Sequence, residues 1–282
     1  MTIARILIIA GSDSGGGAGI QADIRTVTML GGHAMTAITA ITAQNTLGVQ
    51  AVHAVPTDMV LAQIDSVVGD IGVDAVKIGM IGSAVTAAAV AERLARLEGV
   101  PIVFDPVMVA TSGSVLANEE TIAGFAALLR VATVVTPNTD ELAALTDMPV
   151  GNETEIGDAA TNLLDKFGGA ILATGCKIGT GASQTFDDGR TIYLDDHLFD
   201  QLFLQSEEEG WREFSWNDAR IDTQEDHGTG CTLASAIATG LGQGMTLPDS
   251  IVRARAYVRA ALELAPGLGK GHGPMGVPRD VR

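Results

Sequence analysis

Cysteine and basic residues are scarce in this sequence of 282 residues. The two cysteines, Cys176 and Cys231, provide no disulfide framework. Seventeen basic residues against 34 acidic ones give a formal charge of −17, which argues against nucleic acid or an anionic membrane as the main partner. The sequence also lacks an apolar run near the roughly 20 residues of a membrane span and a signal peptide at its start. We therefore expect a cytoplasmic protein whose partners are small molecules, anionic ones included.

Hydrophobic residues are plentiful, at 46% of the chain, which is enough for one large α/β domain over residues 1–282. The chain opens with an apolar run at 5–10, a glycine-rich loop (GSDSGGGAG) and an amphipathic helix that places Ile20, Ile24, Val27 and Leu30 on one face. This order is typical of nucleotide-binding folds. The loop, however, fits neither GxGxxG nor GxxxxGK[ST].

Apolar strands continue to alternate with amphipathic helices as far as about residue 175. This alternation predicts a mostly parallel sheet with helices on both faces. The stretch from about 178 to 217 breaks the pattern, because it is acidic and carries Asp188-Gly189, a tight-turn signal. We expect an exposed flap or edge hairpin there and not a second domain.

Polar or functional side chains follow most of the predicted strands. In an open parallel sheet such residues meet at the carboxyl edge, where ligands bind. The set comprises Asp13, Gln44, Met80, Asp105, Asn138 with Glu141, and Thr174. Together they offer the groups needed to move a phosphoryl group from a magnesium nucleotide to a small acceptor.

Several of these residues also have a purely structural interpretation. Asp13 is compatible with an Asx turn, and Asn138 with a cap on the helix that carries Glu141. His227 is compatible with a structural hydrogen-bond donor, and Lys77, inside a strand, with a salt bridge. Convergence at one edge favours the functional interpretation.

A second glycine-rich stretch, Asp226-His227-Gly228-Thr229-Gly230-Cys231-Thr232, precedes a small, apolar helical run. It predicts a glycine turn that leads into a helix N-terminus, where free N–H groups and the helix dipole favour an anion. The same field is expected to lower the pKa of the Cys231 thiol. The alternative is a glycine-rich helix cap with a buried cysteine.

Long, ordered stretches of the chain resemble the hydroxymethylpyrimidine kinase/phosphomethylpyrimidine kinases of thiamine biosynthesis, a branch of the ribokinase superfamily. The matching stretches are IAGSDSGGGAGIQAD, ITAQNTLGVQAVHAVP, DAVKIGMIGS, FDPVM, VVTPNTDELAAL, IDTQEDHGTGCTLASAIA and APGLGKGHGP. The resemblance implies a ribokinase-like three-layer α/β/α sandwich, ATP and Mg²⁺ as cofactors, and a homodimer. It also implies two phosphorylations at one site, first of 4-amino-5-hydroxymethyl-2-methylpyrimidine and then of its monophosphate.

The resemblance assigns the acceptor site. Gln44 would bind the pyrimidine through its amide, which offers a donor and an acceptor side by side. Met80 and Val107 would form apolar walls, and Gly11 and Asp23 would lie near the hydroxymethyl group.

The resemblance also assigns the phosphoryl-transfer groups. Asn138 and Glu141 match the superfamily's magnesium-organising pair, and Asp105 would support the metal shell. The anion hole would comprise Gly228, Thr229, Gly230 and Cys231.

Cys231 stands where sugar kinases carry an aspartate base. In the second step the nucleophile is a phosphate oxygen that needs no deprotonation and that a carboxylate would repel. A thiol that titrates near neutrality would assist the first step and be tolerated in the second.

Two features depart from the family pattern. The usual KGGH-like turn is replaced by Thr174-Gly175-Cys176-Lys177, so that Thr174 and Lys177 become the candidates for contacts with the nucleotide phosphates. The segment 178–196 is also longer than usual.

Two other functions compete with this assignment. One is a pyridoxal kinase of the same superfamily, which the context of Gln44 disfavours. The other is a non-catalytic pyrimidine-binding protein. An intact Asn138–Glu141 pair beside HGTGC argues against that alternative, because a binder needs neither.

Overall fold

The computed structural model describes residues 3–176, 183–185, 191–193, 197–206 and 210–279. The chain divides into two compact units. Unit 1 contains residues 1–133 and 223–282, and unit 2 contains residues 134–222. The single domain expected over 1–282 stays a prediction. Within the described ranges, no helix combines the length and the apolar character needed to cross a membrane.

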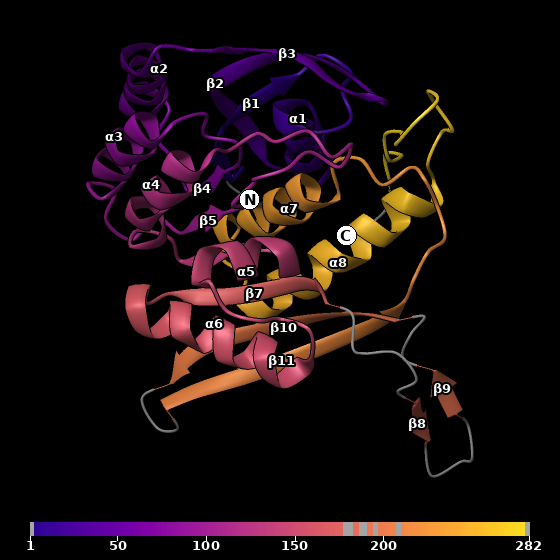
Figure 1. The fold of residues 1–282 in the computed structure, drawn as a ribbon. Helices are drawn as coiled ribbons and strands as arrows, with labels where there is room; N and C mark the ends of the chain where they lie inside the picture. The colour runs from indigo at the N-terminus through magenta and orange to yellow at the C-terminus, as the bar shows by residue number, and fades with distance from the viewer. Residues whose placement is uncertain (1–2, 177–182, 186–190, 194–196, 207–209, 280–282) are drawn as a thin grey trace. The chain divides into compact units, whose positions relative to one another are not determined.

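Unit 1 contributes five neighbouring strands to the sheet, in the order β5-β4-β1-β2-β3 (Figure 1). The neighbouring pairs are parallel except for β2 and β3, which form an antiparallel pair at the edge. This agrees with the mostly parallel sheet that the sequence predicts. The strands are β1 (Arg5–Asp13), β2 (His33–Asn45), β3 (Gly48–Ala54), β4 (Ala75–Ile78) and β5 (Ile102–Phe104).

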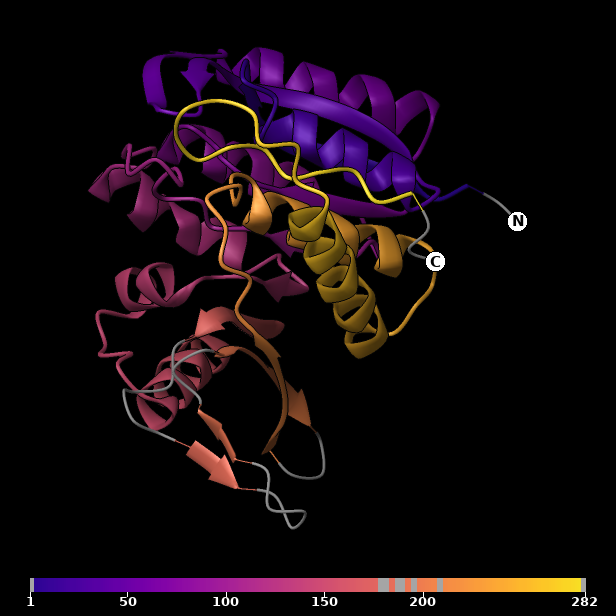
Figure 2. The same cartoon turned by 90° about the vertical axis from the view of Figure 1, so that its right-hand side faces the viewer.

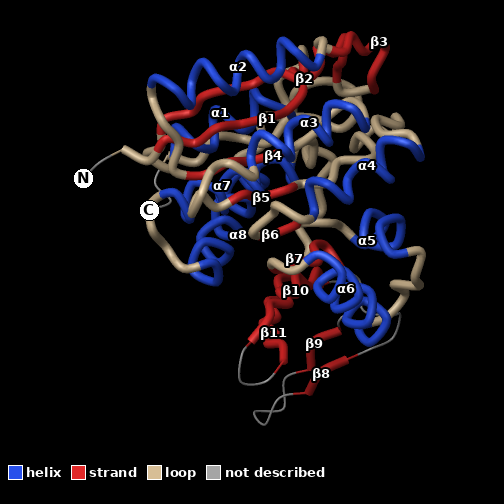
Figure 3. The backbone as a smooth tube through the Cα atoms, turned by 90° about the vertical axis from the view of Figure 1, so that its left-hand side faces the viewer, coloured by secondary structure: helices blue, strands red, loops and turns tan. Residues whose placement is uncertain are grey.

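Helices cover both faces of this sheet and complete the three expected layers. One layer, seen in Figure 2, contains α1 (Gly19–Met29), α7 (Thr229–Gly242) and α8 (Leu247–Glu263), with α7 packed against α1, α8 and the sheet. The opposite layer, seen in Figure 3, contains α2 (Thr57–Asp70), α3 (Ala84–Leu94) and α4 (Glu119–Leu129).

The buried face of α1 differs from the expected one. Ile20 and Val27 are buried as predicted, but Ile24 is exposed, and Asp23 is buried in its place. A carboxylate can occupy this face because the side chain of Lys77, from β4, lies against it and balances its charge. Hydrophobic periodicity cannot show such a partner, because it lies 54 residues further along the chain.

Unit 2 contains a smaller sheet in which β6 pairs in parallel with β7, while β10 pairs antiparallel with β7 and with β11. Two helices, α5 and α6, pack against β7. A separate antiparallel pair, β8 with β9, lies on either side of Asp188-Gly189 in the sequence, and the tight turn expected at these two residues lies outside the described part of the chain. The elements are β6 (Val134–Val135), α5 (Thr139–Thr146), α6 (Glu153–Phe167), β7 (Ala170–Cys176), β8 (Ser183–Thr185), β9 (Thr191–Tyr193), β10 (His197–Ser206) and β11 (Gly210–Ala219).

Candidate active site

The two glycine-rich segments, about 210 residues apart in the sequence, face each other in unit 1. A Cβ at Gly17 would overlap the ring of His227, and a Cβ at Gly228 would overlap the carbonyl oxygen of Gly17. Gly228 also has a φ of +90°, a conformation that L-residues with a side chain rarely adopt. Gly228 is therefore required by close contact with the Gly17 backbone as well as by its own conformation, whereas Gly17 is required by contact with the His227 ring.

The turn at Gly228 leads directly into α7, as the sequence predicts. Gly228 is the N-cap, and the helix begins at Thr229, so that Gly230 and Cys231 lie in its first turn. First-turn N–H groups have no partner within the helix and suit an anion. A Cβ added to Gly230 would lie 3.7 Å from a carboxylate oxygen of Asp105, which places the end of β5 beside the start of α7.

A buried cluster of charges lies behind this turn. The ammonium group of Lys77 is 3.1 Å from Asp23 Oδ2 and 3.7 Å from Asp105 Oδ2. Asp23 Oδ1 accepts a hydrogen bond of 2.8 Å from the hydroxyl of Ser235 in α7. Burial would lower the pKa of Lys77, but the surrounding Asp23, Cys231 and Asp105 groups outweigh this effect and raise it. Lys77 is therefore a cation that holds two carboxylates together, in agreement with the salt bridge expected from its place in a strand.

The environment of Cys231 contradicts the expected activation of its thiol. Burial raises the pKa of Cys231 to about 12. Lys77 opposes this rise, while the Asp105 and Asp23 carboxylates add to it. The field at the start of α7 is too weak to reverse these effects. At neutral pH Cys231 is a neutral thiol, so it cannot serve as the base proposed from the sequence.

Asp105 is the carboxylate in contact with that thiol. Burial raises its pKa to about 6, Asp23 adds to the rise, and Lys77 and a hydrogen bond with the Cys231 side chain oppose it. Among the described residues, Asp105 Oδ2 has no hydrogen-bond partner. Asp105 is thus a carboxylate with spare acceptor capacity beside the start of α7.

The carboxyl ends of β1 and β2 carry a second polar group. The side-chain amide of Gln44 lies 3.2 Å from His227 Nε2, and the same nitrogen is 3.0 Å from Asp13 Oδ2. The Asp13 carboxylate also accepts the backbone N–H of Gly15, which forms the Asx turn considered from the sequence. His227 is a buried structural hydrogen-bonding residue, as the alternative interpretation proposed.

The remaining residues expected around the acceptor differ in how accessible they are. Gly11 lies against Met80, because a Cβ on Gly11 would be 3.1 Å from the Met80 sulfur. Val107 is partly exposed and lies two residues beyond Asp105. Asp23 has no exposed surface, and both of its oxygens are occupied by Lys77 and Ser235. Its contact with an acceptor stays a prediction.

The residues expected to bind the nucleotide lie in unit 2, and so does Glu141, whereas Asp105, the other expected metal residue, lies in unit 1. Asn138 and Glu141 form a reciprocal capping box at the start of α5, in which Asn138 Oδ1 accepts the Glu141 N–H at 2.9 Å and Glu141 Oε2 accepts the Asn138 N–H at 3.0 Å. Thr174 lies beside Asn138, since these two residues form a parallel bridge between their backbones. Lys177, the fourth expected residue, lies outside the described part of the chain.

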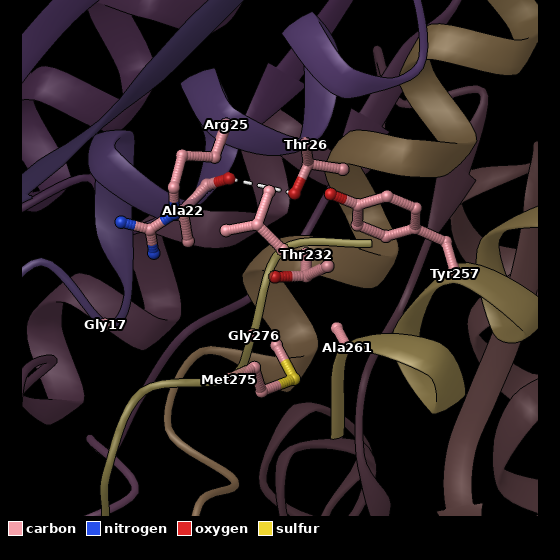
Figure 4. A pocket seen from close by; sticks show the side chains of 10 residues that line it. Gly17, Ala22, Arg25, Thr26, Thr232, Tyr257, Ala261, Met275 and Gly276 are labelled. Carbon is pink, nitrogen blue, oxygen red and sulfur yellow. Dashed lines mark hydrogen bonds between the residues drawn. The ribbon is translucent and has the colours of Figure 1, made fainter. Parts of the chain in front are cut away.

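A small cavity lies between α1, α7, α8 and the C-terminal tail (Figure 4). Arg25, Thr26, Thr232 and Tyr257 contribute its polar side chains. None of the predicted site residues lines this cavity.

Sequence reasoning left two contributors without a functional role: Thr42 and the C-terminal tail. Thr42 Oγ1 lies 3.0 Å from the Gln44 amide. The tail reaches the site because the His227 N–H donates to the Gly273 carbonyl at 3.2 Å. The closely spaced glycines of the tail, in APGLGKGHGP, were the only sign of its close contacts. Their spacing does not show which segment the tail contacts.

The fold and this site define a kinase of the ribokinase-like class. The structure is similar to that of an ADP complex of Bacillus subtilis pyridoxal kinase, with a TM-score of 0.82, 28% identity and coverage of 98% of both chains. It is also similar to the phosphomethylpyrimidine kinase of Clostridium difficile, with a TM-score of 0.72, 31% identity and coverage of 91% of this chain and 98% of that one.

Within this class the sequence matches the phosphomethylpyrimidine kinase family model over residues 13–276. It is 43% identical over 274 residues to a hydroxymethylpyrimidine/phosphomethylpyrimidine kinase of Rhizobium meliloti, covering 95% of each chain. The chain belongs to the phosphomethylpyrimidine kinase family.

Proposed function

We propose that this protein transfers the γ-phosphoryl group of ATP to 4-amino-5-hydroxymethyl-2-methylpyrimidine and then transfers a second one to the resulting monophosphate, for thiamine biosynthesis. The observation that carries the proposal is the meeting of the Gln44 amide, Met80 and the start of α7 at one sheet edge in unit 1. The relative from Rhizobium meliloti carries both activities in its name.

In the first step the hydroxymethyl oxygen attacks the γ-phosphorus, ADP leaves, and the hydroxyl proton is released. The first-turn N–H groups of α7, at Gly230 and Cys231, would stabilise charge on the transferring group. With a pKa of about 12, Cys231 keeps its proton and acts as a hydrogen-bond donor. Asp105 is the carboxylate next to that thiol, and we assign it the proton. In the second step the phosphate oxygen needs no base.

Mg²⁺ commonly binds one or two carboxylates together with substrate phosphates, so a protein cage is not required. This suits the structure, because no three His, Cys, Asp or Glu side chains among the described residues converge to hold a metal ion. We propose that Glu141 holds the ion with the nucleotide, supported by Asn138 and Thr174, and that Lys177 contacts the phosphates. The ion would neutralise phosphate charge during transfer. A metal role for Asp105 also stays a prediction.

A pyridoxal kinase is the second candidate, because the structure is similar to a pyridoxal kinase at a TM-score of 0.82. The Gln44 amide favours the pyrimidine, since an aminopyrimidine presents a donor and an acceptor side by side. A pure binding protein is the third, and the family's kinase activity argues against it.

Phosphorus NMR of parallel reactions with Mg-ATP tests these functions. We expect the pyrimidine alcohol to yield a monophosphate ester and then a diphosphate, with pyridoxal turned over far more slowly. The variant Gln44→Leu keeps the size of the side chain and should lose the preference for the pyrimidine. A monophosphate from pyridoxal alone would establish the vitamin B6 activity, and tight binding without turnover would establish the binder.

We also propose that the protein works in the cytoplasm as a homodimer without nucleic acid. The charge of −17 supports the absence of nucleic acid, because phosphate backbones are repelled by such a surface. Light scattering on the eluted protein gives the mass to compare with the 29.0 kDa of one chain. A single-chain mass would refute the dimer.

A further inference from the structure

A polar chain of three side chains ends at the Gln44 amide. The Asp13 carboxylate accepts the N–H groups of Gly15, Gly17 and Ala18 at 2.8–2.9 Å. Burial opposes its ionisation, but the hydrogen bonds from His227 and from these N–H groups outweigh burial and hold the pKa of Asp13 below its usual value. An ionised carboxylate only accepts hydrogen bonds. His227 Nε2, 3.0 Å away, must therefore carry a hydrogen.

The other neighbour of the amide is the Thr42 hydroxyl, which has a single hydrogen to donate. Thr42 Oγ1 lies 3.0 Å from the carbonyl oxygen of Ser12 and 3.0 Å from the Gln44 amide. The Ser12 carbonyl can only accept, whereas either end of an amide can face a hydroxyl. When the hydrogen goes to Ser12, Thr42 becomes an acceptor toward Gln44.

The two ends of a glutamine amide have nearly the same shape, so its direction is assigned from its hydrogen bonds. If the amide nitrogen faces His227, the Gln44 N–H and the His227 N–H are two donors that face each other across 3.2 Å. Thr42 would then have to leave Ser12 to satisfy the amide oxygen. In the opposite direction the amide oxygen accepts from His227 and the amide nitrogen donates to Thr42. Thr42 keeps its bond to Ser12, and the His227 N–H is shared between Asp13 and the Gln44 oxygen.

We propose that His227 and Thr42 are positioning residues that hold the Gln44 amide with its oxygen on His227 and its nitrogen on Thr42. This proposal extends the proposed function, on which its consequence for the substrate rests. One lone pair of the amide oxygen and one amide N–H then remain for a ligand.

The direction of the amide decides which way round the pyrimidine lies. The exocyclic amine of the substrate would donate to the Gln44 oxygen on the His227 side, and the adjacent ring nitrogen would accept from the amide N–H on the Thr42 side. The hydroxymethyl group is attached next to the amine, on the side away from that ring nitrogen. It therefore points toward His227 and the start of α7. The opposite amide direction would turn the hydroxyl away from Cys231.

The first test uses the ligand-free protein and does not depend on its substrate. In ¹⁵N-labelled protein we expect His227 Nε2 to have the shift of a protonated nitrogen. We also expect the Gln44 amide protons to show nuclear Overhauser contacts with the Thr42 methyl group and not with the His227 ring protons. Contacts with the ring protons would overturn the proposal.

The second test separates positioning from folding. Thr42→Val keeps the shape but removes the acceptor, so we expect the KM for the pyrimidine alcohol to rise about three- to tenfold while kcat and the KM for ATP stay unchanged. Thr42→Ser should restore the KM. The matched control is Thr86→Val, a buried threonine on α3 that bonds Thr57.

Equal effects of Thr42→Val and Thr42→Ser, or of Thr42→Val and Thr86→Val, would overturn the positioning role. Failure of the wild-type protein to phosphorylate the pyrimidine would refute the proposed function instead. In that case the NMR contacts alone still decide the direction of the amide.

Discussion

At the scale of single residues, the environment of Cys231 decides what its thiol can do. The helix N-terminus favours a thiolate, and so does Lys77, but burial and the Asp105 and Asp23 carboxylates favour the protonated form more strongly. The cluster already contains two carboxylates for one ammonium group, so a thiolate would add a second unbalanced negative charge. The thiol is protonated chiefly because it is buried, and the negative carboxylates beside it add to this effect.

The first prediction concerns thiol reactivity. Burial raises the pKa of both Cys176 and Cys231 to about 12. On the order of one thiol in ten thousand is then ionised at pH 8, and only the thiolate reacts with a disulfide reagent. We expect the native protein to react with such a reagent at least a hundredfold more slowly than free cysteine, and both thiols to react at once in guanidinium chloride. In Cys176→Ser, fast release of one equivalent from the native protein would contradict the assignment for Cys231.

The second prediction concerns Asp105, whose pKa burial raises to about 6. Its folded-state pKa lies above the unfolded value near 3.8, so its contribution to stability is present below pH 4 and is lost as the pH rises through 6. We expect the wild type to lose up to about 3 kcal/mol relative to Asp105→Asn between pH 4 and 7. Urea unfolding of both proteins across this range gives the difference. A difference that stays flat or grows with pH would refute the raised pKa.

At the scale of elements, the start of α7 depends on packing as much as on helix capping. The N-cap residue, Gly228, has no side chain. Only glycine fits at this position, because the carbonyl of Gly17 occupies the place where a Cβ would be. The helix interior is lined with small residues that are almost all buried. The segments GSDSGGGAG and DHGTGC are thus two halves of one structure.

The third prediction separates packing from backbone conformation. Gly228 and Gly244 have similar positive φ values of +90° and +83°, but a Cβ at Gly244 would meet nothing within 4 Å. We expect Gly244→Ala to lower the free energy of unfolding by about 1 kcal/mol, the cost of the conformation alone. Gly228→Ala should lower it by about 3 kcal/mol or more and abolish turnover. Equal losses in urea unfolding would show that contact with Gly17 contributes nothing.

Most of the helices and strands of unit 1 were predictable from the sequence. The strands, the helices and the parallel order of unit 1 follow from local periodicity, which depends on neighbouring residues. The buried side of α1 could not be predicted in this way, because Asp23 is buried beside Lys77, which belongs to β4. Asn138 also shows how one pattern serves two purposes: the capping box with Glu141 is present, and the metal role remains a proposal.

At the scale of the whole molecule, the C-terminal tail joins two parts of unit 1 that carry the proposed acceptor site. The N–H groups of Lys270 and Gly271 donate to Thr46 Oγ1, in the turn between β2 and β3, at 3.1 and 3.3 Å. The tail then meets the loop before α7, where His272 Nδ1 lies 2.7 Å from Asp226 Oδ1. It therefore holds the turn that follows Gln44 and the loop that carries His227.

The fourth prediction tests this connection. A Cβ at Gly271 would overlap the carbonyl oxygen of Thr46, whereas a Cβ at Gly267, also in the tail, would meet nothing within 4 Å. We expect Gly271→Ala to displace the turn and to raise the KM for the pyrimidine alcohol about tenfold. The KM for ATP should not change. Gly267→Ala is the control, because its only cost is the φ of +67° at that position. If both variants behave like the wild type, the tail does not position the acceptor site.

The sequence by itself determined the alternation of strands and helices, the two glycine-rich segments and the family, because these properties are local or are matched in order along the chain. Only the tertiary structure decided that the pKa of Cys231 is raised and that His227, itself in contact with Asp13, lies beside the Gln44 amide. A pKa depends on burial and on charges brought together from distant segments, and a hydrogen-bond direction depends on every neighbour of both partners. Neither can be obtained from the spacing of residues along the chain.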